Sequence, residues 1–148
     1  MTNALIVYGS TTGNTESVAE KIADVLRDKG MAVTVKNVTA VSVSELGGDN
    51  DLTVLGSSTW GDEDIEFQED FAELYEHLGD AALHGKNVAI FGCGDSAYTH
   101  FCGAVDLLEE SMEKLKANVV IGSLRIDGDP SDAGDEIHAW AEDLADKA

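Results

Sequence analysis

Residues 4–16 read ALIVYGSTTGNTE, and this stretch decides the fold. The apolar run at 4–8 predicts a buried strand, and the polar turn at 9–15 leads into a helical pattern that begins near 13–16. A strand, a glycine-containing turn and a helix N-terminus together form an anion site, because unpaired N–H groups and the helix dipole point at the turn. The stretch therefore predicts a strand–helix unit that holds a phosphate.

The turn lacks the lysine of most phosphate-binding loops. A Walker A loop reads G-x-x-x-x-G-K-[ST], whereas Gly9 and Gly13 stand one residue too close and Asn14 replaces the lysine. A triphosphate would be poorly neutralised there, but a single phosphate monoester can accept hydrogen bonds from hydroxyls and amides. These polar residues could instead be helix caps, although one helix needs only one cap. The expected phosphate ligands are Ser10, Thr11, Thr12, Gly13, Asn14 and Thr15.

Beyond this unit, apolar runs alternate with segments of helical periodicity. The runs are rich in Val and Ile, as is typical of strands covered on both faces, and lie at 4–8, 32–38, 52–57, 87–92 and 118–126. Helical stripes lie at 18–26, 67–78, 105–115 and 137–144, the last after an apparent helix start at Pro130 and Ser131. Residues 39–50 are expected to be loop with at most a helical turn.

This alternation predicts an α/β fold, a doubly wound parallel sheet of five strands with helices on both faces. At 148 residues, with one proline and no repeat, the chain is expected to be a single domain, 1–148. In such a sheet, ligands bind outside the carboxyl ends of the strands, where the winding direction reverses. The loops after the third and fourth predicted strands are therefore the next places to look for a site.

Charge and cysteine content restrict the partners and the compartment. Nine Lys+Arg against 29 Asp+Glu give a net charge of -20, which disfavours nucleic acid and anionic membranes and favours basic partners. Solubility or adaptation to salt explains the charge equally well. No apolar stretch approaches the ~18 residues of a membrane span, and the chain start does not resemble a signal peptide. Cys93 and Cys102 match no zinc or thioredoxin spacing, which favours two reduced thiols in a cytoplasmic protein over a disulfide.

The loop after the third strand reads SSTWGDEDIEF, residues 57–67. Ser58 and Thr59 add hydroxyls, and Trp60 is followed by Gly61, a flexible backbone position. Trp60 could fill the core, but its polar neighbours favour a surface on which a planar ligand stacks.

The loop after the fourth strand reads CGDSAYTHFCG, residues 93–103. Gly94 permits close backbone approach, Asp95 offers an acceptor and Tyr98 is a second aromatic residue at the same edge. A dinucleotide fingerprint would need glycine at 97, where alanine stands. A monophosphate site, two aromatic faces and an acidic acceptor fit a planar heterocycle joined to one phosphate, and FMN is that molecule.

Four stretches resemble the short-chain flavodoxins, particularly those of sulfate-reducing bacteria. They read ALIVYGSTTGNTE, SSTWGDEDIEFQEDF, FGCGDSAYTHFCGAVD and LRIDGDP, and the resemblance covers essentially the whole chain. It implies a five-stranded sheet in the order 2-1-3-4-5, one non-covalent FMN and a low-potential one-electron carrier. Such a carrier passes between quinone, neutral semiquinone and hydroquinone and has no substrate turnover of its own.

The resemblance also assigns residues. It implies that Ser58 joins residues 10–15 at the phosphate, and that Thr59, Trp60, Gly61 and Asp62 line one side of the flavin ring. The other side or the polar edge of the ring would contact Cys93, Gly94, Asp95, Tyr98 and Cys102. His100 departs from the commonly aromatic residue of related sequences, and we interpret it as a solvent-exposed histidine.

Electrostatics fits a low potential. No Lys or Arg occurs in 9–15, 57–66 or 93–102, whereas 62–64 are all acidic. These acids tune the potential or only the surface charge. A flavin anion among carboxylates is disfavoured, and each ~1.4 kcal/mol of destabilisation lowers a one-electron potential by about 59 mV. The expected partners are basic redox proteins, such as cytochromes and ferredoxin- or flavodoxin-dependent oxidoreductases, which a monomeric carrier meets transiently and in a salt-sensitive way.

Gly61 is predicted to favour the neutral semiquinone. Its carbonyl would accept a hydrogen bond from the flavin ring after the 61–62 peptide reorients, which glycine permits because it reaches positive φ without steric cost. Gly61→Ala is therefore expected to reduce semiquinone accumulation in a dithionite titration. An unchanged amount would remove Gly61 from the mechanism.

Three other classes fit less well. A flavin-dependent quinone reductase usually has extra segments for a substrate pocket, and NADH:quinone activity without a partner would revive that hypothesis. A response-regulator receiver needs an acidic pair after the first strand and an aspartate after the third, where Tyr8-Gly9 and Ser57-Ser58 stand. A low-molecular-weight phosphatase needs Cys-x5-Arg, and neither cysteine has an arginine six residues on.

Overall fold

The computed structural model describes residues 3–9, 14–41, 43–46, 50–60, 66–67, 74–77, 83–94, 103–127 and 133–147. For 14, 43–44, 58–60, 66–67, 93–94, 103–104 and 127, the description is limited to the backbone. The strands are β1 (Asn3–Gly9), β2 (Ala32–Asn37), β3 (Leu52–Trp60), β4 (Glu66–Phe67), β5 (Asn87–Gly94), β6 (Asn118–Val119) and β7 (Leu124–Asp127). The helices are α1 (Asn14–Asp28), α2 (Val43–Leu46), α4 (Gly103–Lys114) and α5 (Gly134–Lys147), with a 3₁₀ turn η1 (Val38–Ala40).

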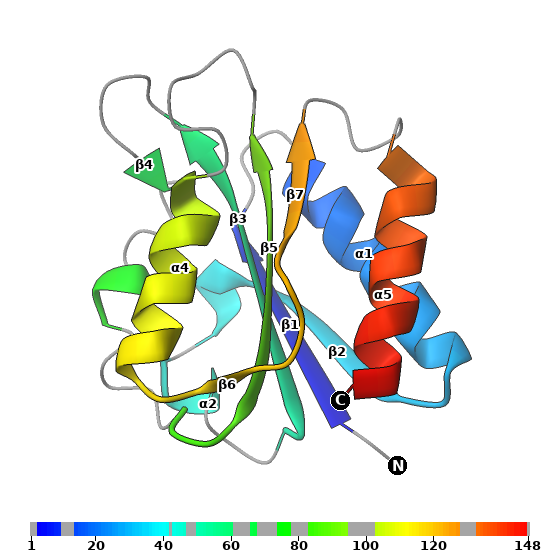
Figure 1. Ribbon diagram of the computed structural model, residues 1–148, viewed down its shortest axis with the longest axis horizontal. Coiled ribbons are helices and arrows are strands. Elements are labelled where there is room, and N and C mark those ends of the chain that lie inside the picture. Colours follow the sequence, from blue (N-terminus) through cyan, green and yellow to red (C-terminus); the bar gives the residue numbers. More distant parts are fainter. Residues whose placement is uncertain are drawn as a thin grey trace.

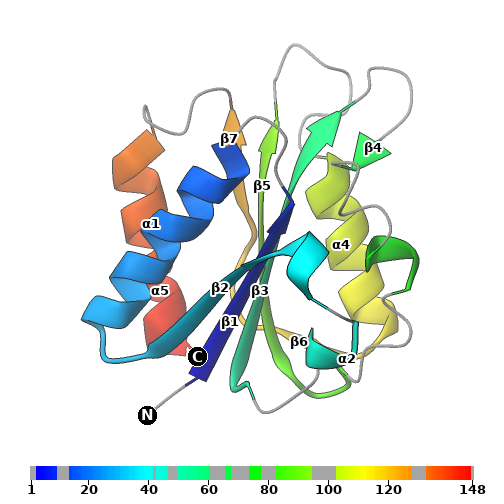
Figure 2. The same ribbon diagram turned by 180° about the vertical axis from the view of Figure 1, so that it is seen from behind.

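The sheet has the predicted winding. Its path is β2-β1-β3-β5-β6, with β7 also paired to β5, and all of these pairs are parallel. Because β5 is the fourth predicted strand and β6 with β7 the fifth, the order 2-1-3-4-5 is confirmed. Helices α1 and α5 cover one face and α4 covers the other (Figures 1 and 2). None of the helices in the described part of the chain is long and apolar enough to cross a membrane.

Two apolar clusters hold the helices to the two faces. One joins α1 and α5 to the sheet through residues such as Ile6, Ile22 and Leu144, and the other joins α4 through Leu108 and Met112. All five of these side chains are fully buried. Burying a side chain of this size contributes roughly 1.5–3 kcal/mol, so the double cover explains why the central strand β1 is apolar on both faces.

Two glycines allow close packing in the middle of the sheet. A Cβ added at Gly56 would lie 2.1 Å from Cζ of Phe91, whose ring covers this part of β3. A Cβ added at Gly92 would lie 2.4 Å from Cγ2 of Val105, in the first turn of α4. Gly92 therefore serves the approach of α4 to the sheet.

The predicted helical stripe at 67–78 is wrong at its first residue. Phe67 lies in β4, which pairs antiparallel with the end of β3 through Thr59↔Phe67 and Trp60↔Glu66. Leu74 is buried in a short helical turn at 74–76, while 71 and 78 lie outside the described residues. The spacing matches a helical repeat, but pairing with β3 satisfies the backbone of Phe67 instead.

The fifth predicted strand, 118–126, is interrupted. Val119 pairs with Val88 and Leu124 with Phe91, so five positions of this segment advance along only three of β5. The extra residues are held by side chains, because Trp140 Nε1 donates to the Gly122 carbonyl at 2.7 Å and Ser123 Oγ donates to Glu109 at 3.0 Å.

The segment 39–50 contains little helix, as predicted. Among the described residues of 39–50, helical structure is limited to the end of η1 and the single turn α2. The carbonyl of Leu46, the last residue of α2, accepts from Thr53 Oγ1 at 3.0 Å. Helix α5 begins at Gly134, and the predicted helix start at 130–131 lies outside the described residues.

Candidate functional site

The carboxyl ends of the central strands meet at one edge of the sheet. Gly9 pairs with Ser57, Ser58 pairs with Cys93, and Gly94 pairs with Asp127. Figure 1 shows the tips of β3, β5 and β7 together at the upper edge of the view. The predicted ligand loops therefore leave the sheet from neighbouring points, as the switch-point rule requires.

Thr15 is the described residue that points most directly to a ligand. It lies in the first turn of α1, the residue is 1% exposed, and its hydroxyl has no hydrogen-bond partner among the described residues. An unsatisfied buried hydroxyl costs about 1–3 kcal/mol, so such groups in native structures need an explanation. An anion at the N-terminus of α1 supplies one, because it accepts from both the hydroxyl and the free backbone N–H groups.

Tyr8 fastens the first turn of α1 to the sheet. Its hydroxyl is hydrogen-bonded with the side chains of Glu16, in α1, and Asn37, at the end of β2. Burial and the negative charge of Glu16 raise the pKa of Tyr8 above its usual value of 10.0. The phenol therefore stays protonated at neutral pH and donates to the carboxylate, which fixes the helix N-terminus beside Gly9.

The other predicted site residues are placed only in part. Asn14 begins α1; Ser58, Thr59 and Trp60 end β3; Cys93 and Gly94 end β5. The backbones of Ser58 and Cys93 are paired, so the structure brings together a predicted phosphate ligand and a predicted ring contact. The remaining predicted residues lie outside the described residues: Ser10, Thr11, Thr12, Gly13, Gly61, Asp62, Asp95, Tyr98 and Cys102, together with His100.

Sequence reasoning missed how the loop after β3 is anchored. Residues 61–65 join two antiparallel strands, since Trp60 pairs with Glu66. The backbone of Trp60 is thereby fixed in a ladder at the carboxyl edge. The signal in the sequence is a pair of aromatic residues, Trp60 and Phe67, on either side of a stretch that contains Gly61, but Phe67 also fits a helical stripe.

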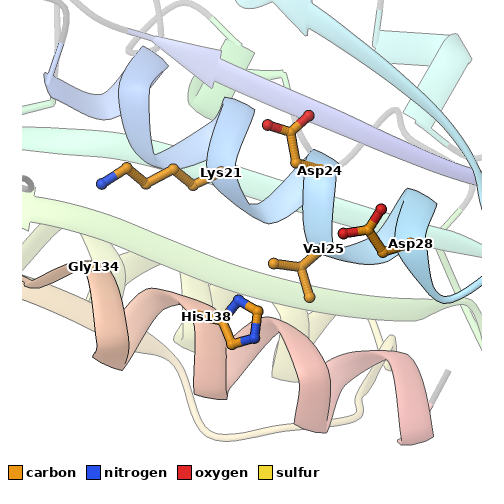
Figure 3. A pocket seen from close by; sticks show the side chains of 6 residues that line it. All are labelled: Lys21, Asp24, Val25, Asp28, Gly134 and His138. Carbon is orange, nitrogen blue, oxygen red and sulfur yellow. The ribbon is translucent and has the colours of Figure 1, made fainter.

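A cavity lies away from this edge. It holds about 290 Å³ between α1 and α5 and is lined by Lys21, Asp24, Val25, Asp28, Gly134 and His138 (Figure 3). Asp28 is the last residue of α1, so the cavity extends toward the opposite edge of the sheet. Across the described ranges, no group of three or more His, Cys, Asp or Glu side chains could hold a metal ion.

Comparisons with known proteins agree with the fold. The flavodoxin family model matches residues 6–140. A flavodoxin of Maridesulfovibrio salexigens is 55% identical over 147 residues, covering 99% of both chains, and one of Nitratidesulfovibrio vulgaris is 48% identical over 141 residues, covering 95% of both. The crystal structure of oxidised flavodoxin 2 from Bacillus cereus matches with a TM-score of 0.90 at 34% identity, covering 99% of both chains.

Proposed function

This chain belongs to the flavodoxin family, and on that premise we propose where its cofactor is held and which surfaces its partners meet. The protein is an electron carrier that binds FMN non-covalently and turns over no substrate of its own. FMN supplies the capacity to take up and release electrons one at a time, and the protein controls its position and surroundings. The carrier passes these electrons between redox proteins.

The phosphate is proposed to bind at the N-terminus of α1. The observation that carries this assignment is the buried hydroxyl of Thr15, which has no hydrogen-bond partner among the described residues and lies in the first turn of the helix. The backbone N–H groups of that turn are free to bind an anion. Residues 10–14 complete the proposed cradle, and Ser58 adds a hydroxyl from β3. Hydroxyls and amides hold the anion here without a nearby lysine or arginine, which keeps fixed positive charge away from the flavin.

The flavin ring is proposed to lie between the ends of β3 and β5. Thr59, Trp60, Gly61 and Asp62 are assigned to one side of it. The pairing of β3 with β4 supports this, because it fixes the backbone from which Trp60 projects. The other side or the polar edge is assigned to Cys93, Gly94, Asp95, Tyr98 and Cys102.

Charge around the proposed ring site supports a low potential. All nine Lys and Arg residues lie within the described ranges, and only Lys36 and Arg125 stand in strands near the carboxyl edge. Lys36 pairs with Glu45 at 3.1 Å, and Arg125 pairs with Asp106 and Glu109. Both positive charges are thus already matched by carboxylates, so neither is free to stabilise an added electron.

Basic redox proteins are the proposed partners, docked transiently at the acidic edge. We expect the rate of electron transfer to a basic cytochrome to fall as ionic strength rises toward and beyond 0.1 M, where the Debye length is about 10 Å. Stopped-flow absorbance measures this rate across a salt series, with a small neutral electron acceptor as the control. A rate to the cytochrome that does not change with salt would instead assign the charge to solubility.

A visible spectrum of the purified protein tests the function as a whole. We expect flavin absorption bands, and a long-wavelength band on half reduction. A colourless protein that takes up no added FMN would contradict the proposal. We further propose that the chain acts as one domain in the cytoplasm. We also propose that it is a monomer, because chains of charge -20 repel one another. Sedimentation velocity tests the monomer.

A further inference from the structure

We propose that Arg125 is a positioning residue for the flavin ring, acting through ion pairs that fix the start of α4 against the sheet. The segment 95–102 joins β5 to α4 and carries three of the residues assigned above to the ring, Asp95, Tyr98 and Cys102. The inference therefore rests on the proposed function. It concerns what sets the separation between the two ends of that segment.

The first contact is a branched ion pair. Arg125 Nη2 donates to Glu109 Oε1 at 2.7 Å and also to Asp106 Oδ1, both in α4. Glu109 is held a second time, because Ser123 Oγ donates to its Oε2 at 3.0 Å. The Arg125 side chain is 33% exposed, so water screens these bonds only in part.

The direction of Arg125 follows from the strand. Its neighbours Leu124 and Ile126 are buried in the cluster beneath α1 and α5. Since successive side chains of a strand point to opposite faces, Arg125 faces α4. Asp106 and Glu109 stand three residues apart, so they share one side of that helix and meet the same guanidinium.

A second contact lies directly beside the first. Arg125 pairs with Gly92 of β5, and Val105 packs so close to Gly92 that a Cβ added there would lie 2.4 Å from Cγ2 of Val105. The first turns of α4 are thus held at two adjacent points, by an apolar contact on β5 and by ion pairs to β7. The segment 95–102 is flanked by residue 94, two positions after Gly92 in β5, and by residue 103, two positions before Val105 in α4.

The two contacts differ in what they fix. Val105 against Gly92 sets how close α4 lies, but an apolar contact permits sliding along the sheet. Hydrogen bonds from one guanidinium to two carboxylates are directional and oppose that sliding. Although burial lowers the pKa of Arg125, its bonds to Asp106 and Glu109 raise the pKa overall, so the guanidinium stays charged.

The test compares two flavins in the full-length chain. Riboflavin lacks only the phosphate of FMN, so its affinity reports the ring and the ribityl chain without the phosphate. Arg125→Gln is expected to raise the dissociation constants of FMN and riboflavin by the same factor, about five- to tenfold, as loss of one or two partly screened charged hydrogen bonds predicts. Fluorescence titration measures both constants. The titrations are carried out at denaturant concentrations well below those at which the flavin-free chain unfolds.

Lys36→Gln is the matched control. Lys36 is also a strand cation paired with a helix glutamate, with 38% of its side chain exposed, but it holds α2. We expect it to leave both dissociation constants and the visible circular dichroism of bound FMN unchanged. Arg125→Gln should alter that dichroism, because the band reports the surroundings of the ring. Arg125→Lys keeps the charge but loses the planar guanidinium that donates to two carboxylates. Its dissociation constants and dichroism should lie between those of the parent chain and Arg125→Gln.

Different outcomes test the positioning role of Arg125 and the proposed ring site on which it rests. If Arg125→Gln lowers the unfolding midpoint but leaves both affinities and the dichroism unchanged, the ion pairs are only structural and the inference is wrong. A loss confined to FMN also overturns it. Should Arg125→Gln not fold, Asp106→Asn tests the same bond. Tyr98→Ala distinguishes failure of the Arg125 inference from failure of the proposed ring site, because unchanged riboflavin binding in that variant contradicts the ring site itself.

Discussion

Gly56→Ala should lower the free energy of unfolding by about 3 kcal/mol, the largest effect on stability that we expect from adding one methyl group. The new Cβ would lie 2.1 Å from Cζ of Phe91 and 2.4 Å from both Cε atoms. Phe91 is fully buried and its backbone pairs with Gly56. The ring cannot swing aside without displacing neighbours in a close-packed core, so strands or ring must shift.

Guanidinium unfolding of the FMN-loaded protein, followed by far-ultraviolet circular dichroism, measures this change. Gly122→Ala is the control, since a Cβ there meets nothing within 4 Å, and its effect should stay within about 0.5 kcal/mol. Phe91→Leu should recover part of the loss in the Gly56→Ala background, because the smaller side chain makes room. If Gly56→Ala is as stable as the parent chain, the packing of Phe91 over Gly56 is not as described.

Most of the sheet could be predicted because its determinants are local. The strand at 4–8 is apolar on both faces and α1 begins at Asn14, where the sequence placed its start near 13–16. Each helix on the sheet follows a strand, so alternation alone gave the layers. The order 2-1-3-4-5 came from the resemblance to flavodoxins and is confirmed by the strand pairing.

The failures arise where distant residues decide local structure. Phe67 fits a helical stripe, but the two residues of β4 pair with the end of β3, and periodicity cannot detect so short a strand. The break at 120–123 contains a long-range bond, because Trp140 of α5 donates to the Gly122 carbonyl. Its place in an apolar stripe gave no sign of this bond.

In the candidate site, too, features set by contiguous residues could be predicted and features set by strand register could not. The sequence pointed to the carboxyl edge and to Thr15, because glycine, hydroxyl and helix patterns are contiguous there. It did not connect Arg125 to Asp106 and Glu109, although all three are visible in the chain. That connection needs the register of β7 on β5, which no local pattern encodes.

Thr15→Val is expected to have the largest effect on the cofactor, a ten- to hundredfold weaker binding of FMN with riboflavin binding unchanged. A hydrogen bond to a charged group contributes about 1.5–3 kcal/mol, and tenfold in affinity corresponds to about 1.4 kcal/mol. Both side chains are β-branched, so the helix itself is little affected. Fluorescence titration with each flavin gives the ratio of affinities that identifies the phosphate.

The same substitution should stabilise the flavin-free chain slightly, because it removes a buried hydroxyl that has no partner among the described residues. Thr53→Val is the matched control: Thr53 is also buried, but its hydroxyl donates to the Leu46 carbonyl at 3.0 Å. That variant should lose about 1 kcal/mol of stability and leave the ratio of FMN to riboflavin affinity unchanged. If Thr15→Val raises the stability of the flavin-free chain and weakens FMN binding, the hydroxyl of Thr15 contributes to ligand binding rather than to folding. If FMN and riboflavin weaken together, the hydroxyl does not contact the phosphate.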